Sequence, residues 1–214
     1  MRYIILALLL LVGVSVSEAK TSFGIKGGLH SGGSTQDPDD GFEVKPLGGI
    51  LLGGVMERPL NSQRSIFFRG EFLYVQKGWK EEGKISIDGI WYDYEGTVKA
   101  PELVLAPFVD FRFKAEGFTP YVEFGLEFGH VLSTDAELEI LGVTASGSID
   151  DYATSNFGLN FGVGTNVPAG QGDLQFGLRF NRGLKNMNDG DEDFEVRTNG
   201  VMLIVGYMFS TRKI

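Results

Sequence analysis

Apolar and polar residues alternate with a period of two along most of this chain from about residue 22 onward. The segment 102–113 shows the pattern clearly, because its odd positions are all apolar and its even positions include Glu102, Asp110 and Arg112. Successive side chains of a β-strand point to opposite faces. The segment therefore predicts a strand with one apolar face and one partly charged face.

The same alternation predicts eight strands in all. They are the segments 22–29, 44–55, 68–74, 102–113, 120–129, 156–164, 174–181 and 200–209. The second segment is apolar on both faces and contains Gly48-Gly49 and Gly53-Gly54, so its register stays open. A strand that crosses a bilayer at a tilt needs about 9–11 residues, and the predicted strands are close to this length.

The connections between these strands alternate in length. A link of moderate length is expected at 56–65, short links at 114–117 and 168–172, and long polar links at 31–41, 80–97, 134–151 and 185–195. This is the pattern of an all-β, eight-stranded antiparallel up-and-down transmembrane β-barrel with short periplasmic turns and long outer loops. Two long links look structured: an Asp88-Gly89 turn predicts a hairpin, and 138–149 alternates again.

The first residues read as a targeting segment and not as part of the fold. Arg2 precedes an apolar run at 4–16, which is followed by Ser17-Glu18-Ala19. The run is shorter than the roughly 20 residues of a membrane helix, and the small residues fit a signal-peptidase site. We expect residues 1–19 to be a cleaved signal peptide and 20–214 to be the outer-membrane barrel domain; a retained N-terminal anchor helix is the less favoured alternative.

Composition narrows the class of protein further. The net charge of −9 leaves no basic excess for nucleic acid, and the absence of cysteine excludes disulfides and thiol chemistry. The 31 glycines and 17 phenylalanines favour strands over helices. We expect a monomer in contact with outer-membrane lipid, with no cofactor and no nucleic acid.

Charged residues recur on the face opposite the apolar one, and nine of them are expected to fill the lumen. They are Lys26, Arg69, Glu71, Glu102, Asp110, Arg112, Glu123, Glu127 and Arg179. An eight-stranded barrel is just wide enough for its side chains to fill, and buried charges must be paired. This near balance of charge favours a salt-bridged plug; a proton or ion path is the alternative.

Other candidate chemistry is weaker. His30 and His130 are expected at the rims at headgroup level, and His130 has Ser133 and Asp135 nearby in sequence but on another face. No hydrolase or metalloprotease motif is present, so we assign no catalytic, cofactor or metal residue. Trp79 and Trp91 predict either an interfacial aromatic belt or a binding surface.

The first and fourth long links are acidic. Their carboxylates are Asp37, Asp39, Asp40, Asp189, Asp191, Glu192, Asp193 and Glu195. A solvated, self-repelling surface is the simplest reading. One hypothesis is that these loops bind divalent cations that bridge to lipopolysaccharide.

Several stretches together resemble a known family. They are Phe23–Leu29, Glu71–Gly78, Phe157–Gly164, Arg179–Asn186 and Val205–Phe209. They are similar to the outer-membrane β-barrel domain family abundant in Bacteroidota, often labelled "porin family" or PorT-like. The resemblance implies an outer-membrane location and an eight-stranded barrel, and little about activity. Barrel chains often end on the aromatic residue of their last strand. This chain departs from that pattern, because residues 210–214 follow Phe209.

The sequence therefore predicts a small outer-membrane barrel with a filled lumen and a structural or surface-interaction role, and not an enzyme. Three alternatives remain. The first is an exported soluble barrel that binds an apolar ligand, as lipocalins do, with apolar side chains inside. The second is a rim-site barrel enzyme that modifies lipid. The third is a conducting porin.

Overall fold

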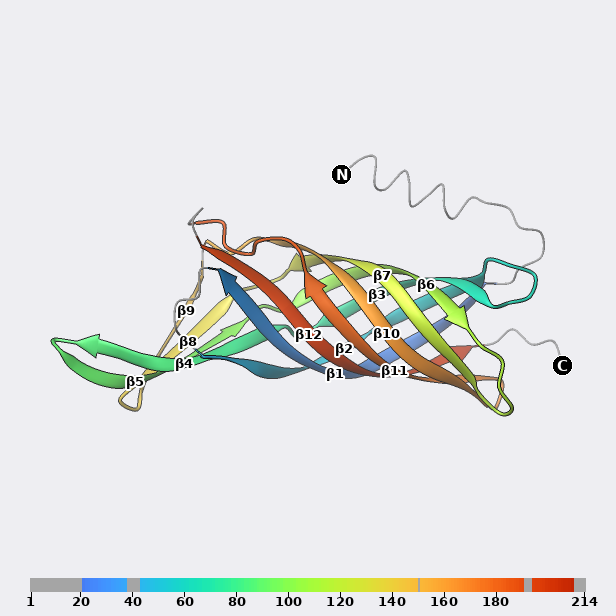
Figure 1. Cartoon of the computed structure of the whole chain (residues 1–214), viewed down its shortest axis with the longest axis horizontal. Helices are drawn as coiled ribbons and strands as arrows, with labels where there is room; N and C mark the ends of the chain where they lie inside the picture. Colours follow the sequence, from blue (N-terminus) through green and yellow to red (C-terminus); the bar gives the residue numbers. More distant parts are fainter. Residues whose placement is uncertain (1–20, 38–42, 150, 191–193, 210–214) are drawn as a thin grey trace.

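Twelve β-strands make up the part of the chain that this computed structural model describes, which comprises residues 21–37, 43–149, 151–190 and 194–209. Eight of them wind into a barrel (Figure 1). The barrel strands are β1 (Ser22–Asp37), β2 (Glu43–Pro59), β3 (Ile66–Val75), β6 (Glu102–Arg112), β7 (Thr119–Val131), β10 (Ser155–Ala169), β11 (Gly172–Gly183) and β12 (Glu195–Phe209).

The barrel is closed because β1 pairs with both β2 and β12. The order round the wall is β1-β12-β11-β10-β7-β6-β3-β2, and each neighbouring pair is antiparallel. Closure leaves the wall without an edge, so its backbone groups are satisfied by strand pairing even where lipid surrounds them. The predicted fold class is confirmed.

The two faces of the wall have the predicted polarity. Phe124 and Phe161 lie side by side on the outside, with ring centroids 5.0 Å apart, and are 52% and 42% exposed. Their neighbours along the chain, such as Glu123, are buried in the lumen. An apolar outside and a charged inside suit a barrel in hydrocarbon, and the lipocalin-like alternative, which requires the reverse, is wrong.

The connections differ at the two ends of the barrel, as expected. At one end the links are short, at 60–65, 113–118 and 170–171. At the other end four more strands continue past the barrel: β4 (Gly78–Ile87), β5 (Ile90–Lys99), β8 (Asp135–Ile140) and β9 (Val143–Ser148). These strands, with residues 43–46 of β2 that pair with β4, form the projecting sheet seen at the left of Figure 1.

Both hairpins of the projecting sheet have tight two-residue turns. Asp88 and Gly89 have φ of 52° and 81°, and Leu141 and Gly142 have φ of 56° and 74°. Positive φ at both central positions is the type I′ turn, whose twist matches that of paired strands. The hairpin at Asp88-Gly89 is confirmed, and the alternating stretch 138–149 forms part of a second hairpin.

Two expectations about the first long link and the second strand needed correction. The link was placed at 31–41, but β1 extends to Asp37 and pairs with β12 over that length. In β2, Leu51 pairs with Val75 and Pro46 pairs with Trp79. These two pairs are five residues apart along β2 but only four residues apart along the segment from β3 to β4, so β2 contains one extra residue. This one-residue bulge changes the register where β2 leaves the barrel, and β2 continues to Pro59, beyond the predicted end at residue 55.

The predicted signal peptide, residues 1–19, lies outside the described residues and stays a prediction. Among the described residues, no helix has the length and apolar character needed to cross a membrane.

Phe161→Arg should destabilise the membrane-embedded barrel by about 2–4 kcal/mol, because a charge on the lipid face near mid-membrane is poorly solvated. Phe113→Arg, at the short-turn end, is the matched control and should cost about 0–1 kcal/mol. Urea unfolding in lipid vesicles, followed by heat-modifiable gel migration, measures both. Equal losses at the two positions would argue against a lipid-facing Phe161.

Candidate functional site

The lumen holds most of the charged residues that alternation assigned to it. Eight of the nine are no more than 2% exposed, and the ninth, Arg112, has a side chain 9% exposed. Each comes from a barrel strand whose inward positions alternate with lipid-facing ones. With the water largely excluded, their charges are balanced by one another and by buried amides.

The central cluster joins opposite walls of the barrel. Arg179 on β11 lies four strands from β3 in either direction round the wall. Its guanidinium donates to Glu71 at 2.8 and 3.0 Å and to Glu123 at 2.7 Å. The Glu71 pair is bidentate, the strong and geometrically specific form of arginine–carboxylate contact. This contact therefore spans the lumen from β11 to β3.

Arg69 and Lys26 complete the central cluster. Arg69 lies 3.0 Å from Asp110 and 3.2 Å from Glu71, and also pairs with Glu123. Lys26 lies 2.5 Å from Glu71. Each carboxylate of the cluster therefore has at least one cationic partner, which is the condition for burying it.

An aromatic ring supports the two arginines. The Arg179 guanidinium carbon lies 4.1 Å from the centroid of the Phe108 ring, and that of Arg69 lies 5.3 Å from it. A desolvated cation over a ring face is stabilised by the ring quadrupole. Phe108 belongs to an apolar cluster within the lumen, formed by Leu51, Leu73, Val75, Val104, Ala106, Phe108, Met202 and Ile204.

A second layer lies nearer the projecting sheet and depends on a residue that the sequence reasoning missed. Lys77, 4% exposed, lies 2.5 Å from Glu127 and 2.9 Å from Glu102. Asn160 and Asn181 donate to Glu127 at 3.1 and 2.9 Å. Extending the alternation of β3 by two residues beyond Val75 would have found Lys77.

A third layer lies toward the short turns. Arg112 pairs with Glu57 and lies 3.3 Å from Asp110. Glu57 is 7% exposed and was also missed. It sits on the last part of β2, which continues to Pro59, whereas the predicted second strand ended at residue 55 and left Glu57 in the following link.

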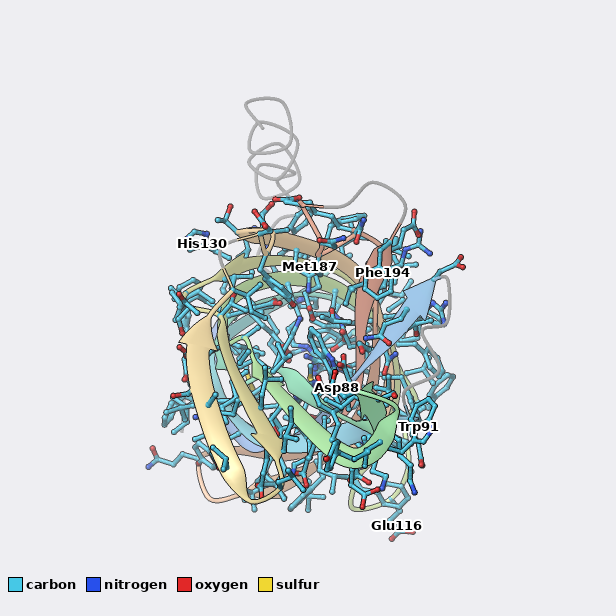
Figure 2. All side chains as sticks on the ribbon, turned by 90° about the vertical axis from the view of Figure 1, so that its left-hand side faces the viewer. Asp88, Trp91, Glu116, His130, Met187 and Phe194 are labelled. Carbon is cyan, nitrogen blue, oxygen red and sulfur yellow. The ribbon has the colours of Figure 1, made fainter. Side chains whose placement is uncertain are left out.

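The mouth beneath the projecting sheet is covered by an apolar cluster. Trp79 stacks on Tyr152 with ring centroids 6.3 Å apart, and Met187 has 0% exposure. The other buried members are Ala100, Val131, Ala153 and Val196. In Figure 2, which looks onto this end, Met187 lies within the ring of barrel strands. Burial also raises the pKa of Tyr152.

Backbone hydrogen bonds hold this cover in place. Ala153 N donates to Met187 O at 2.8 Å, and Met187 N donates to Val196 O at 2.7 Å. Asn186 Oδ1 accepts from Asn188 N at 3.0 Å and from Val196 N at 2.8 Å. The third and fourth links are therefore fastened to each other over the lumen.

The two tryptophans do not form the interfacial belt that was one of their expected roles. Trp79 is 4% exposed in the mouth cluster, whereas Trp91 is 68% exposed on the β4–β5 hairpin, beside the tip residue Asp88. Trp79 Nε1 donates to Glu81 at 2.6 Å. The strand alternation of β3 continues into β4, which turns Trp79 inward and away from headgroups.

The two histidines have different environments. His30 was expected at the rim, but it is 3% exposed inside the barrel, with Nδ1 3.0 Å from Gln76 O. His130 is exposed at the outer margin of the barrel (Figure 2). Ser133 Oγ donates to Asp135 at 3.4 Å, and within the described residues no hydrogen bond joins His130 to either.

The projecting sheet reverses the polarity of the barrel wall. Its outer face, which continues the lipid-facing side, carries ion pairs: Lys80–Glu95 at 2.6 Å, Lys99–Glu137 at 2.7 Å and Lys45–Glu82. The hydrogen bond between Lys80 and Glu95 raises the pKa of Lys80 and lowers that of Glu95. The change from phenylalanines to charges marks where the hydrocarbon ends.

The acidic links show no metal site in the part that is described. Asp39, Asp40, Asp191, Glu192 and Asp193 lie outside the described residues. Among the described ones, no group of three or more histidines and carboxylates could hold a metal ion. The Asn188 side chain forms hydrogen bonds with the backbone, because it donates to Phe194 O at 2.8 Å and accepts from Gly190 N.

These features define an integral outer-membrane β-barrel. Residues 17–189 match the sequence model described as "Outer membrane protein beta-barrel domain", and the chain belongs to this family. The protein is located in the outer membrane, where its apolar wall contacts lipid. A comparison with curated proteins found no match.

Among the solved structures that match this chain are three with low sequence identity. Neisserial surface protein A has 13% identity and a TM-score of 0.44, with 87% of this chain and 97% of that chain covered. Ail of Yersinia pestis has 17% identity and a TM-score of 0.40, with 90% of this chain and 100% of that chain covered. OprG of Pseudomonas aeruginosa has 11% identity and a TM-score of 0.44, with 90% of this chain and 98% of that chain covered. At such low values the assignment rests on the family match and not on these structures.

Arg179→Leu should lower the free energy of unfolding by about 3–5 kcal/mol, because it leaves Glu71 and Glu123 buried with fewer cationic partners. Lys99→Met, which removes the half-exposed Lys99–Glu137 pair, should change it little. Denaturant titration in lipid vesicles compares the two variants. Similar small losses for both would show that the central cluster does not stabilise the barrel.

Proposed function

We propose that this protein is a closed, non-conducting outer-membrane barrel that carries a folded acidic sheet at the cell surface and serves in surface interaction. The observation that carries the proposal is the bridging of the lumen by Arg179, Glu71 and Glu123. The two further ion-pair layers and the apolar mouth cover support it. The nine lumen residues predicted from sequence, with Lys77 and Glu57, act in this proposal as a structural plug.

The projecting sheet is the part of the molecule available to other molecules. The strands of its β4–β5 hairpin have 10 residues each, as many as the barrel strand β3, and those of its β8–β9 hairpin have 6 each, which is more than a link between two strands requires. Ordered strands outside the membrane suit a binding surface better than a spacer, because loops that only connect elements are usually short. We therefore assign the interaction to this sheet and not to the lumen.

Three narrower expectations form part of the proposal. The resemblance to PorT-like proteins of Bacteroidota remains a prediction from sequence, as does the monomeric state. Contact with lipopolysaccharide requires bridging divalent cations in this scheme, because the projecting sheet has an acidic excess.

We expect the purified protein to form no stable channel in planar lipid bilayers, because paired side chains fill the lumen at three levels. A porin purified in the same detergent is the positive control. Reproducible open steps of defined conductance would contradict the closed lumen and support an ion path through the charged residues.

The orientation can be tested with single cysteines, since the natural chain has none. Lys84→Cys, whose site is 68% exposed on β4, should react with a membrane-impermeant maleimide on intact cells. Glu116→Cys, in the short turn 113–118, should react only after the cells are opened. The reverse labelling pattern would place the projecting sheet in the periplasm and end the proposal.

A further inference from the structure

The projecting sheet ends in an open edge. β9 pairs with β8, and in the described part of the chain no strand pairs with its other side. All six of its residues, Val143 to Ser148, are exposed. The sequence Val-Thr-Ala-Ser-Gly-Ser has neither a charge nor a proline, the residues with which native proteins usually block an edge strand.

The register shows which backbone groups of β9 are available. Ile149 N donates to Thr134 O at 3.1 Å, so this pair is hydrogen-bonded across the hairpin. In an antiparallel ladder such pairs alternate, which turns the backbone of Val143, Ala145 and Gly147 toward β8. The N–H and C=O groups of Thr144, Ser146 and Ser148 therefore point away from the sheet, and form a ready template for another strand.

The two faces beside this edge differ in chemistry. On the inner side, which continues the lumen-facing surface, Leu138 and Val143 are 41% and 71% exposed. On the outer side, Asp135, Glu137 and Glu139 lie opposite Ser148, Ser146 and Thr144. A strand added to β9 would lie about 9–10 Å from β8. A lysine or arginine side chain can cross the short serines and threonine to reach those carboxylates.

Charge selects the kind of strand that can be added. The projecting sheet with its turns carries four lysines and nine acidic residues, a net charge of −5. All four lysines already pair with carboxylates: Lys45, Lys80, Lys84 and Lys99. Within the described residues no ion pair reaches Asp135 or Glu139. A second copy of this chain would bring like charges together, and nucleic acid or lipopolysaccharide phosphate would be repelled.

We propose that β9 accepts an extended cationic segment of another protein as an additional antiparallel strand. Apolar side chains of the guest pack on the inner side by Leu138 and Val143, and its alternate basic side chains lie over Asp135 and Glu139. Backbone pairing supplies affinity and the two faces supply selectivity. This inference rests on the proposed function, because the partner must reach the sheet from outside the cell.

The test uses the full protein in lipid nanodiscs and a fluorescent peptide of alternating valine and lysine as the probe. Anisotropy should show saturable binding that weakens with added salt. A peptide of the same composition with its valines and lysines in separate blocks should bind at least about tenfold more weakly, because it cannot present one apolar and one basic face. Equal binding of the two peptides would overturn the inference.

Variants of the edge separate backbone pairing from general attraction. Ser146→Pro removes an outward N–H without touching the pairing with β8, and should weaken binding by about tenfold. Ser146→Ala keeps that N–H and should bind as the natural chain does. Heat-modifiable migration checks that each variant is folded. Undiminished binding by a folded Ser146→Pro protein would refute strand addition.

The charge requirement has its own matched pair of variants. Glu139→Gln should weaken binding several-fold, whereas Glu116→Gln, which removes the same single charge at the opposite end of the barrel, should not. Equal effects of the two would show that only overall charge matters. Nanodiscs expose both ends of the barrel, so peptide binding is independent of orientation. If the cysteine labelling pattern contradicts the proposed orientation but the peptide still binds, only the proposed function is refuted. If the labelling pattern is as expected but the peptide does not bind, only this inference is refuted.

Discussion

The pairing of Arg179 with Glu71 across the barrel is the interaction on which the rest of the structure depends. The two residues come from strands on opposite sides of the wall, so their bidentate contact spans the lumen. Each charge is buried from water and is stabilised there by the other, together with Lys26 and Arg69 beside Glu71 and with Glu123 beside Arg179. A wider barrel would separate them, and a narrower one would have no room for the guanidinium. The strand number and the buried charges therefore require one another.

The same alternation has opposite consequences above and below the membrane surface. Within the barrel, the outward positions are phenylalanines and leucines, because hydrocarbon surrounds them. In β4, β5 and β8 the outward positions become lysines and glutamates, because water surrounds them. The inward positions change in the opposite direction, from Glu127 and Lys77 to Trp79 and Met187 at the mouth. The mouth thus closes by hydrophobic packing, where an ion pair would face water and contribute little.

Alternation was enough to place Lys26, Glu123 and Arg179 in the lumen, because a period of two assigns each side chain to a face without knowledge of the partner strand. It failed where the period is interrupted or the strand end is uncertain. Glu57 was missed because the second strand was ended at residue 55, which placed Glu57 in the following link, and Lys77 because it lies two residues beyond the end of β3. His30 was assigned to the rim because β1 was ended before residue 31, whereas the strand extends to Asp37 and carries His30 into the interior.

By itself, the sequence determined the fold class, the order of the strands, the membrane-facing side and the Asp88-Gly89 hairpin beyond the barrel. These follow from local spacing and turn chemistry, which a single strand already contains. Only the tertiary structure decided which charges meet, that the third and fourth links cover the mouth, and that β9 is left as an open edge. Those features depend on which strands become neighbours when the sheet closes, and closure joins residues that are more than a hundred positions apart, as it does Glu71 and Arg179.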